Sequence, residues 1–125
     1  MSFYVHVETI RRALFELEKI YEGRDITVKA GAEIIIPSEN GVKVDEFRTK
    51  TIALMVNYSF QYWIEVSDDG TNFYNYFDHN DASLVTDKIN TIVVDEDFMY
   101  LRVKIKNPDT TDHKILYISI KGRRI

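Results

Sequence analysis

The segment of residues 60–77 constrains the fold most, because it has the pattern of a β-hairpin. Between residues 60 and 67, two kinds of side chain alternate with a period of two, as in a strand with two different faces. The pair Asp69 and Gly70 then interrupts the alternation. Such a pair is typical of a hairpin turn, because glycine adopts a positive φ without a Cβ clash. An aromatic segment, residues 73–77, follows as the returning strand.

Further strand patterns fill the chain on both sides of this hairpin. Residues 98–106 alternate most regularly, and residues 51–59 are apolar at successive positions, which favours a central strand covered on both sides. The other predicted strands are residues 25–30, 32–36, 42–47, 89–94 and 115–121. About eight strands at close spacing, with turn residues between them, predict an all-β fold of two antiparallel sheets, a β-sandwich or jelly roll.

Residues 8–22 are the exception, since they predict one N-terminal α-helix. Their apolar side chains recur at spacings of three and four and form one stripe, and Gly23 suits a left-handed C-terminal cap. The stripe consists of Ile10, Ala13, Leu14, Leu17, Ile20 and Tyr21. It also fits two heptads, so the helix either packs on its own sheet or forms a short coiled coil between subunits. We expect one domain over residues 1–125, with the helix segment at 1–23 and the sandwich at 24–125.

The composition excludes several classes of function. The chain has 125 residues and no cysteine, so disulfides and thiolate metal sites are excluded. A net charge of −4 argues against nucleic acid as a partner. No apolar run approaches the roughly 20 residues that span a membrane, and charged residues stand where a signal peptide has its apolar core. We therefore expect a protein without Sec-type export, or one released in another way, such as by cell lysis.

The residues that carry most enzyme chemistry are scattered. His6, His79 and His113 lie in three separate regions, and none stands beside a serine or cysteine nucleophile motif. No G-x-S-x-G, P-loop or H-E-x-x-H motif occurs. We expect exposed polar histidines, no cofactor and no enzymatic activity.

Two loops carry oxygen ligands of the kind that Ca²⁺ binds. Asp78, Asn80 and Asp81 form the first group, and a second group lies in the hairpin turn at residues 68–72. Neither has EF-hand spacing, and Asp and Asn also favour turns because their side chains bond the nearby backbone. We favour the turn interpretation for both groups and predict no metal site.

Aromatic residues of the hairpin are the clearest functional feature. If Tyr62 faces the core, Trp63 points away from it, and Tyr74 and Tyr76 alternate with their neighbours in the same way. An exposed row of these rings would serve as a protein interface or as a platform on which sugars stack. The alternative is that the rings fill a core layer beneath the N-terminal helix.

The hairpin and two later strands resemble the discoidin-like, galactose-binding-like β-sandwich modules. In those modules a strand leads into a Ser-x-Asp-Gly turn, a later strand reads Tyr-(Ile/Leu)-Arg-(Val/Ile), and the last strand closes on glycine. The matching residues here are Ser67, Asp69, Gly70, Phe73, Tyr100, Leu101, Arg102, Val103 and Gly122. This chain departs from the pattern in its shorter length, its predicted helix, and its lack of paired cysteines and of a signal peptide. The resemblance covers about half of the chain and implies the sandwich more than the ligand.

In overall style the chain also resembles small structural proteins of tailed-phage virions, such as head decoration, head–tail connector, and tail or baseplate proteins. This resemblance implies a non-enzymatic assembly protein in the virion, bound to other virion proteins or to copies of itself, with a trimer as one closed arrangement. The alternative location is the cytoplasm. The expected interface residues are Ile10, Leu14, Leu17, Tyr21, Trp63, Tyr74 and Tyr76.

The alternative function is that of a carbohydrate-binding module of the discoidin-like type. Loops at one end of the sandwich would then hold a glycan against an aromatic platform. The ligand-binding candidates for this function are Asp78, His79, Asn80 and Asp81.

Overall fold

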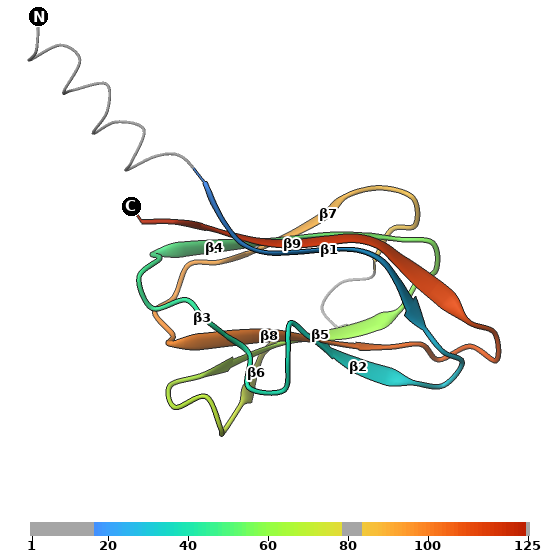
Figure 1. The fold of residues 1–125 in the computed structure, drawn as a ribbon, viewed down its shortest axis with the longest axis horizontal. Helices are drawn as coiled ribbons and strands as arrows, with labels where there is room; N and C mark the ends of the chain where they lie inside the picture. Colours follow the sequence, from blue (N-terminus) through green and yellow to red (C-terminus); the bar gives the residue numbers. More distant parts are fainter. Residues whose placement is uncertain (1–16, 79–83, 125) are drawn as a thin grey trace, which may run out of the picture.

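The computed structural model describes residues 17–78 and 84–124, and these residues form two antiparallel β-sheets packed face to face (Figure 1). The strands are β1 (Glu18–Val28), β2 (Glu33–Ile36), β3 (Val42–Lys43), β4 (Thr49–Val56), β5 (Gln61–Ser67), β6 (Tyr74–Asp78), β7 (Asn90–Val94), β8 (Tyr100–Lys106) and β9 (His113–Arg123). The four-stranded sheet has the order β1-β9-β4-β7. The five-stranded sheet has the order β2-β8-β5-β6, with β3 paired to β8. The prediction of a two-sheet antiparallel sandwich is therefore confirmed.

The core lies between the two sheets, where the period-two alternation places every second side chain. Ile52 and Leu54 of the four-stranded sheet are fully buried, as are Ile64 and Val103 of the five-stranded sheet. The prediction that the central strand β4 is covered on both faces is wrong, because its burial alternates and only one face is buried. Within the described residues, no helix is long and apolar enough to cross a membrane.

The predicted N-terminal helix is wrong over the part that the structure describes. Residues from Glu18 onward form β1, which pairs along the whole of β9 from Glu18 opposite Gly122 to Val28 opposite His113. The long ladder of pairs with β9 and the packing of Ile20 against the core outweigh the modest helix propensity of this segment. Gly23 is consequently a strand residue instead of a helix cap. The remainder of the predicted helix lies outside the described residues.

A β-bulge accounts for the last two residues of the predicted helical stripe, Ile20 and Tyr21. The register with β9 shifts between Lys19 and Tyr21, so the consecutive residues Ile20 and Tyr21 both pack against the core. A bulge adds a residue to one strand and breaks the period of two that marks a regular strand. The sandwich thus begins at Glu18, ahead of the predicted boundary at residue 24.

Candidate binding surface at one end of the sandwich

Three connections gather at the end of the sandwich where β4, β6 and β8 begin: residues 44–48, 68–73 and 95–99. The left side of Figure 1 shows this end. It holds two hollows. The Tyr74 hollow, of about 320 Å³, is lined by Val66, Ser67, Asp68, Asp69, Asn72, Tyr74 and Phe98. The acidic hollow, of about 390 Å³, is lined by Asp45, Glu46, Phe47, Arg48, Asp95, Asp97 and Arg124.

In the Tyr74 hollow, an exposed aromatic ring and a carboxylate face the same space. Tyr74 is the first residue of β6 and is 71% exposed. Asp68 is also exposed and has no hydrogen-bond or ion-pair partner among the described residues. Phe98 adds a second, half-buried ring. The hollow therefore combines a flat apolar surface with a carboxylate that is free to accept hydrogen bonds.

The wall of this hollow is held by a network within the hairpin turn. The carboxylate of Asp69 accepts hydrogen bonds from the backbone N–H of Thr71 at 2.9 Å and of Asn72 at 2.8 Å. It also accepts from the Asn72 side-chain amide and from the Ser67 hydroxyl, each at 2.8 Å. These bonds hold the pKa of Asp69 far below its usual value, the bond from the Asn72 backbone most of all. Asp69 therefore fixes the turn, and its carboxylate is already occupied.

Gly70 and Tyr100 connect this turn to β8. Gly70 has a φ of +76°, and a Cβ added there would lie 3.2 Å from the Tyr100 ring. Tyr100 is also the ladder partner of Ser67. Two parts of the discoidin-like pattern, the Ser-x-Asp-Gly turn and the later tyrosine, are thus in contact. Among the described residues, no group of three His, Cys, Asp or Glu side chains is arranged to hold a metal ion.

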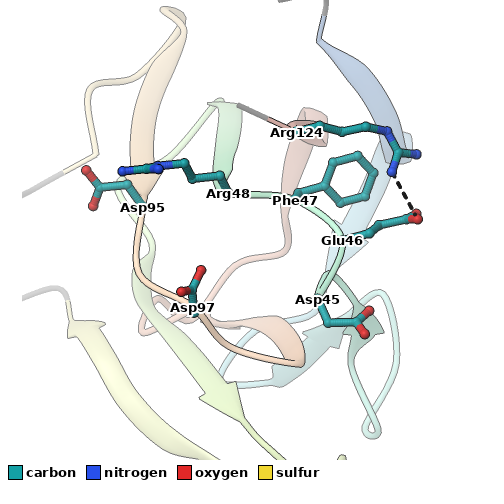
Figure 2. A pocket seen from close by; sticks show the side chains of 7 residues that line it. All are labelled: Asp45, Glu46, Phe47, Arg48, Asp95, Asp97 and Arg124. Carbon is teal, nitrogen blue, oxygen red and sulfur yellow. Dashed lines mark hydrogen bonds and ion pairs between the residues drawn. The ribbon is translucent and has the colours of Figure 1, made fainter. Parts of the chain in front are cut away.

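Figure 2 shows the acidic hollow, whose Asp95 and Asp97 belong to the same connection as Phe98 of the Tyr74 hollow. Arg124 at its rim donates to both carboxylate oxygens of Glu18, at 2.8 and 3.1 Å, and to Glu46 at 3.2 Å. In Figure 2, Arg48 extends toward Asp95 on the opposite side. Each side of the hollow thus carries a guanidinium group next to a carboxylate, and the hollow is more polar than the Tyr74 hollow.

Lys50 lies beneath the acidic hollow and was missed by the sequence analysis. It is fully buried, and its ammonium group donates to the backbone carbonyl of Glu96 at 2.6 Å. Longer contacts of 3.4 and 3.5 Å reach the carbonyls of Phe47 and Arg48. Burial lowers the pKa of Lys50, and the nearby carboxylates of Asp97 and Asp95 oppose that shift. The lysine therefore ties together two connections that line the hollow. Its place in the alternation of β4, on the same side as buried Ile52, could have predicted this.

The outer face of the five-stranded sheet carries Trp63 and a charged cluster. Glu65 is almost completely buried there, with its carboxylate 2.7 Å from Arg102 Nε and 3.5 Å from Lys104 Nζ. The Lys104 ammonium group lies 4.9 Å from the centre of the Trp63 ring, and the Arg102 guanidinium lies 4.0 Å from the centre of the Phe73 ring. Trp63 is half-buried on this face.

The structure does not bring the expected aromatic row together. Trp63 pairs with Asp78 and Tyr74 pairs with Val66, so the two rings lie near opposite ends of the hairpin ladder. The register shifts between Ile64 and Glu65, and this bulge turns Tyr76 toward the core, where its ring packs edge-on against Phe98 at 5.7 Å.

The other expected interface residues lie near or beyond the N-terminal limit of the described chain. Tyr21 is half-buried against the core in β1, and Leu17 is 41% exposed just before that strand. Ile10 and Leu14 lie outside the described residues. The interface role of this set stays a prediction.

Of the predicted ligand residues, the structure describes Asp78, which is at the other end of the sandwich. Asp78 is the last residue of β6, opposite Trp63, whereas both hollows lie where β6 begins. His79, Asn80 and Asp81 lie outside the described residues. The Tyr74 hollow brings the predicted aromatic Tyr74, at the start of β6, together with Asp68 and Phe98, which come from two separate connections.

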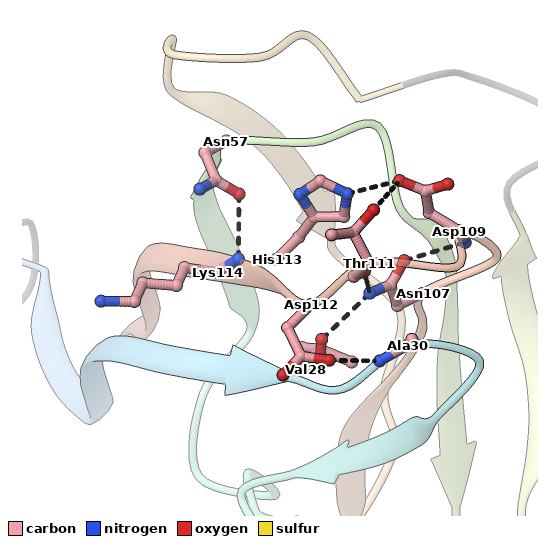
Figure 3. A network of polar contacts seen from close by, with 9 residues as sticks. All are labelled: Val28, Ala30, Asn57, Asn107, Asp109, Thr111, Asp112, His113 and Lys114. Atoms are coloured by element: carbon pink, nitrogen blue, oxygen red, sulfur yellow. Dashed lines mark hydrogen bonds and ion pairs between the residues drawn. The ribbon is translucent and has the colours of Figure 1, made fainter.

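His113 at that other end is not the exposed side chain that we expected (Figure 3). Its ring stacks on Tyr58 with 4.0 Å between ring centres, and its Nε2 lies 2.7 Å from Asp109 Oδ2. The hydrogen bond from His113 is the main reason that the pKa of Asp109 is lowered. Asn107 donates to the carbonyls of Val28 at 3.0 Å and Thr111 at 2.8 Å. This network fixes the connection between β8 and β9.

Comparisons with known proteins found likenesses among solved structures, and the three described below all have TM-scores below 0.5. No family model matches the sequence, and no curated protein matches it. A similar solved structure is the Yersinia pseudotuberculosis-derived mitogen, at 14% identity and a TM-score of 0.47, covering 88% of this chain and 86% of that one. Another is the apo form of BiXyn10A CBM1, at 8% identity and a TM-score of 0.44, covering 84% of this chain and 99% of that one.

A third similar structure contains the CBM22-1 and GH10 modules of the Clostridium thermocellum N-terminal endo-1,4-β-D-xylanase 10B, complexed with xylohexaose. The identity is 10% and the TM-score is 0.42, and the match covers 89% of this chain but 28% of that one. Two of these three structures therefore contain carbohydrate-binding modules. At these TM-scores the likenesses carry no conclusion about ligands, and they do not show the resemblance to virion proteins.

Proposed function

We propose that the protein is a non-enzymatic carbohydrate-binding β-sandwich and that the Tyr74 hollow holds the sugar. The observation that carries the proposal is that the exposed ring of Tyr74 and the unpaired carboxylate of Asp68 line one hollow of about 320 Å³. A sugar presents an apolar C–H face and a rim of hydroxyl groups. An aromatic ring packs against the first, and a carboxylate accepts hydrogen bonds from the second. The hollow is also within the size range of small-ligand sites.

The rigidity of the hairpin turn supports this assignment. Ser67, Asp69 and Asn72 bond to one another and to the turn backbone, so the wall beside Tyr74 is set before a ligand arrives. A preformed wall lowers the ordering cost of binding. Asp69 is fully engaged, which leaves Asp68 as the carboxylate that is available to the ligand.

The first test measures the affinity of Tyr74 variants for a glycan selected on an array of neutral and charged oligosaccharides. We expect Tyr74→Ala to weaken binding on the order of tenfold, since stacking on one ring contributes about 1.4 kcal/mol. Tyr74→Phe is the matched control, because it keeps the ring and should bind within about threefold of the wild type. The ring is largely exposed, so both variants should fold, which circular dichroism checks.

A second test removes the charge from the other wall. Asp68→Asn keeps the size of the side chain but exchanges one acceptor oxygen for an amide donor, so we expect a several-fold loss of affinity. Asp45→Asn, on the acidic hollow, is the comparison. If no glycan binds the wild type, or if Tyr74→Ala binds as well as the wild type, the proposal is wrong.

A second candidate function is that of a non-enzymatic structural subunit, such as a head decoration, connector or baseplate protein of a phage-type virion. The observation that favours it is a group of exposed apolar side chains at one edge of the four-stranded sheet. These are Val85, Ile89 and Val93, each more than half exposed. Their surface is separate from both hollows, so the two functions can be tested independently.

A further inference from the structure

The three connections at the end of the sandwich that holds both hollows carry an excess of negative charge. Residues 44–48, 68–73 and 95–99 hold seven carboxylates and one cationic side chain, that of Arg48. A hollow between such connections attracts cationic ligands and repels anionic ones. The carboxylates are those of Asp45, Glu46, Asp68, Asp69, Asp95, Glu96 and Asp97.

The Tyr74 hollow shares this charge. Among the described residues, its lining contains the carboxylates of Asp68 and Asp69 and no Lys, Arg or His. The hydrogen bonds that lower the pKa of Asp69 stabilise its charged form, so they occupy its oxygens without removing its charge. Asp68 is exposed and has no hydrogen-bond or ion-pair partner in the described part of the chain. Asp68 therefore presents a negative charge to a ligand in this hollow.

The cationic side chains around these connections lie away from the Tyr74 hollow. Arg102 lies on the outer face of the five-stranded sheet, where its Nε is 2.7 Å from the carboxylate of Glu65. Arg48 and Arg124 line the acidic hollow instead, and Lys50 is buried beneath it. An anionic group entering the Tyr74 hollow would thus meet two carboxylates and no cation to balance it.

Tyr76 shows that the negative potential reaches the wall of this hollow. Its ring packs edge-on against the lining residue Phe98, with 5.7 Å between ring centres. The pKa of Tyr76 is raised, first by burial and then by the carboxylates of Glu96 and Asp95. Both carboxylates belong to the connection that carries Phe98. Negative charge therefore acts on the hollow from this connection as well as from the hairpin turn.

We propose that the sugar held in the Tyr74 hollow carries a free amino group, so that its ammonium form donates to the carboxylate of Asp68 while the sugar ring packs on Tyr74. This inference rests on the proposed function and adds the class of sugar. An ammonium group donates three hydrogen bonds, and its bond to a carboxylate is stronger than that of a neutral hydroxyl. Acidic sugars are excluded, because their carboxylates would lie beside those of Asp68 and Asp69.

The test compares the affinities of three β-1,4-linked oligosaccharides of equal length, made of glucosamine, glucose or glucuronate. They share one ring type and linkage and differ in an amino group or a carboxylate. Calorimetry is done at mildly acidic pH, where the amino groups are protonated and aspartates are ionised. We expect the glucosamine oligomer to bind roughly fivefold more tightly than the glucose oligomer, and the glucuronate oligomer to bind most weakly. The preference should shrink in about 1 M salt, where screening acts within roughly 3 Å.

A pair of variants separates Asp68 from the general charge of the chain, which is −4 and attracts any polycation. Asp68→Asn should bring the glucosamine oligomer to within about twofold of the glucose oligomer. Asp45→Asn is the matched control, because it makes the same change of charge on the acidic hollow and should keep the preference. Both side chains are exposed, so both variants should fold, which circular dichroism checks.

The outcomes distinguish this inference from the proposed function. If Tyr74→Ala weakens binding but the glucosamine and glucose oligomers bind equally, the hollow holds a sugar and the amino-sugar inference is wrong. The inference is also wrong if Asp45→Asn reduces the preference as much as Asp68→Asn, or if the glycans bound on the array are all neutral or acidic. If Tyr74→Ala leaves the binding of every oligomer unchanged, the proposed function fails and the inference fails with it.

Discussion

Replacing Lys50 by methionine tests how the loop end of the sandwich is held together. Methionine has a similar length and fits the buried site, but it cannot donate hydrogen bonds. The substitution leaves the backbone carbonyl of Glu96 without the 2.6 Å bond from the ammonium group. The contacts to the Phe47 and Arg48 carbonyls, at 3.4 and 3.5 Å, are near the limit for a hydrogen bond and contribute little.

The expected loss follows from the one strong bond. A hydrogen bond to a charged group contributes about 1.5–3 kcal/mol, and an unsatisfied buried carbonyl costs a similar amount. The methionine variant no longer has to bury a charge, which offsets part of this loss. We therefore expect the free energy of unfolding to fall by about 2 kcal/mol, with a drop of roughly 5–10 °C in the melting temperature.

The pH dependence gives this prediction a second readout. Because burial lowers the pKa of Lys50 in the folded state, the unfolded state binds more protons above the folded pKa. The free energy of unfolding of the wild type should therefore rise relative to Lys50→Met between the folded pKa and the ordinary lysine pKa of about 10.4. For a lysine whose pKa is raised by a partner, the free energy of unfolding would instead fall relative to the methionine variant as the pH rises.

The assay is chemical denaturation of both proteins between pH 7 and about 10, with circular dichroism as the signal. Lys43→Met is the control, since Lys43 is largely exposed and its contact with Asp45 is 3.9 Å, so little change is expected. A Lys50→Met variant as stable as this control would refute the reasoning. So would a difference in stability that does not change with pH.

The remaining predictions concern a close approach, an aromatic ring and a turn. Gly122→Ala should cost about 1–3 kcal/mol, because the new Cβ would lie 2.4 Å from the buried Phe47 ring; thermal unfolding measures this, and a neutral result contradicts it. Trp63→Ala should leave glycan binding at the Tyr74 hollow unchanged in calorimetry, because Trp63 lies away from that hollow; a loss of affinity without unfolding would move the site. Asp69→Asn should lower stability near neutral pH, because bonds to its carboxylate depress its pKa. The difference should shrink as acid titrates the wild-type carboxylate, and a difference that grows in acid contradicts this.

Regular alternation allowed the sandwich to be predicted from the sequence. β8 shows this most clearly, since Leu101, Val103 and Ile105 are all fully buried as their spacing indicates. The Asp69–Gly70 turn was also predictable, because a positive φ and carboxylate bonds to the backbone are local properties. Local chemistry was sufficient wherever strands were regular.

Bulges account for two errors in the prediction from sequence: Ile20 and Tyr21 were assigned to a helix, and Tyr76 was assigned to an exposed aromatic row. In β1, a bulge places Ile20 and Tyr21 on the same side and imitates helical spacing. In the hairpin, a bulge turns Tyr76 toward Phe98 and separates it from Trp63. A bulge depends on how two strands pair, so neither could be read from one segment alone.

The candidate site was only partly predictable for a related reason. Tyr74 was selected from its aromatic spacing, but Phe98 reaches the same hollow from a connection more than twenty residues away in the chain. The sequence likewise did not show that position 122 must be glycine, because the ring that a Cβ there would contact belongs to Phe47 on a distant connection. These relations depend on the topology of the two sheets, which brings residues 44–48, 68–73 and 95–99 to one end.

The most direct test of glycan binding by the Tyr74 hollow is an NMR titration of the ¹⁵N-labelled chain with an oligosaccharide selected on the array. The account predicts saturable shifts of the backbone amides of residues 67–74 and of Phe98, with no comparable shifts on the outer face around Trp63 and Glu65. Shifts confined to that outer face, or no saturable shifts with any array-positive glycan, would contradict it.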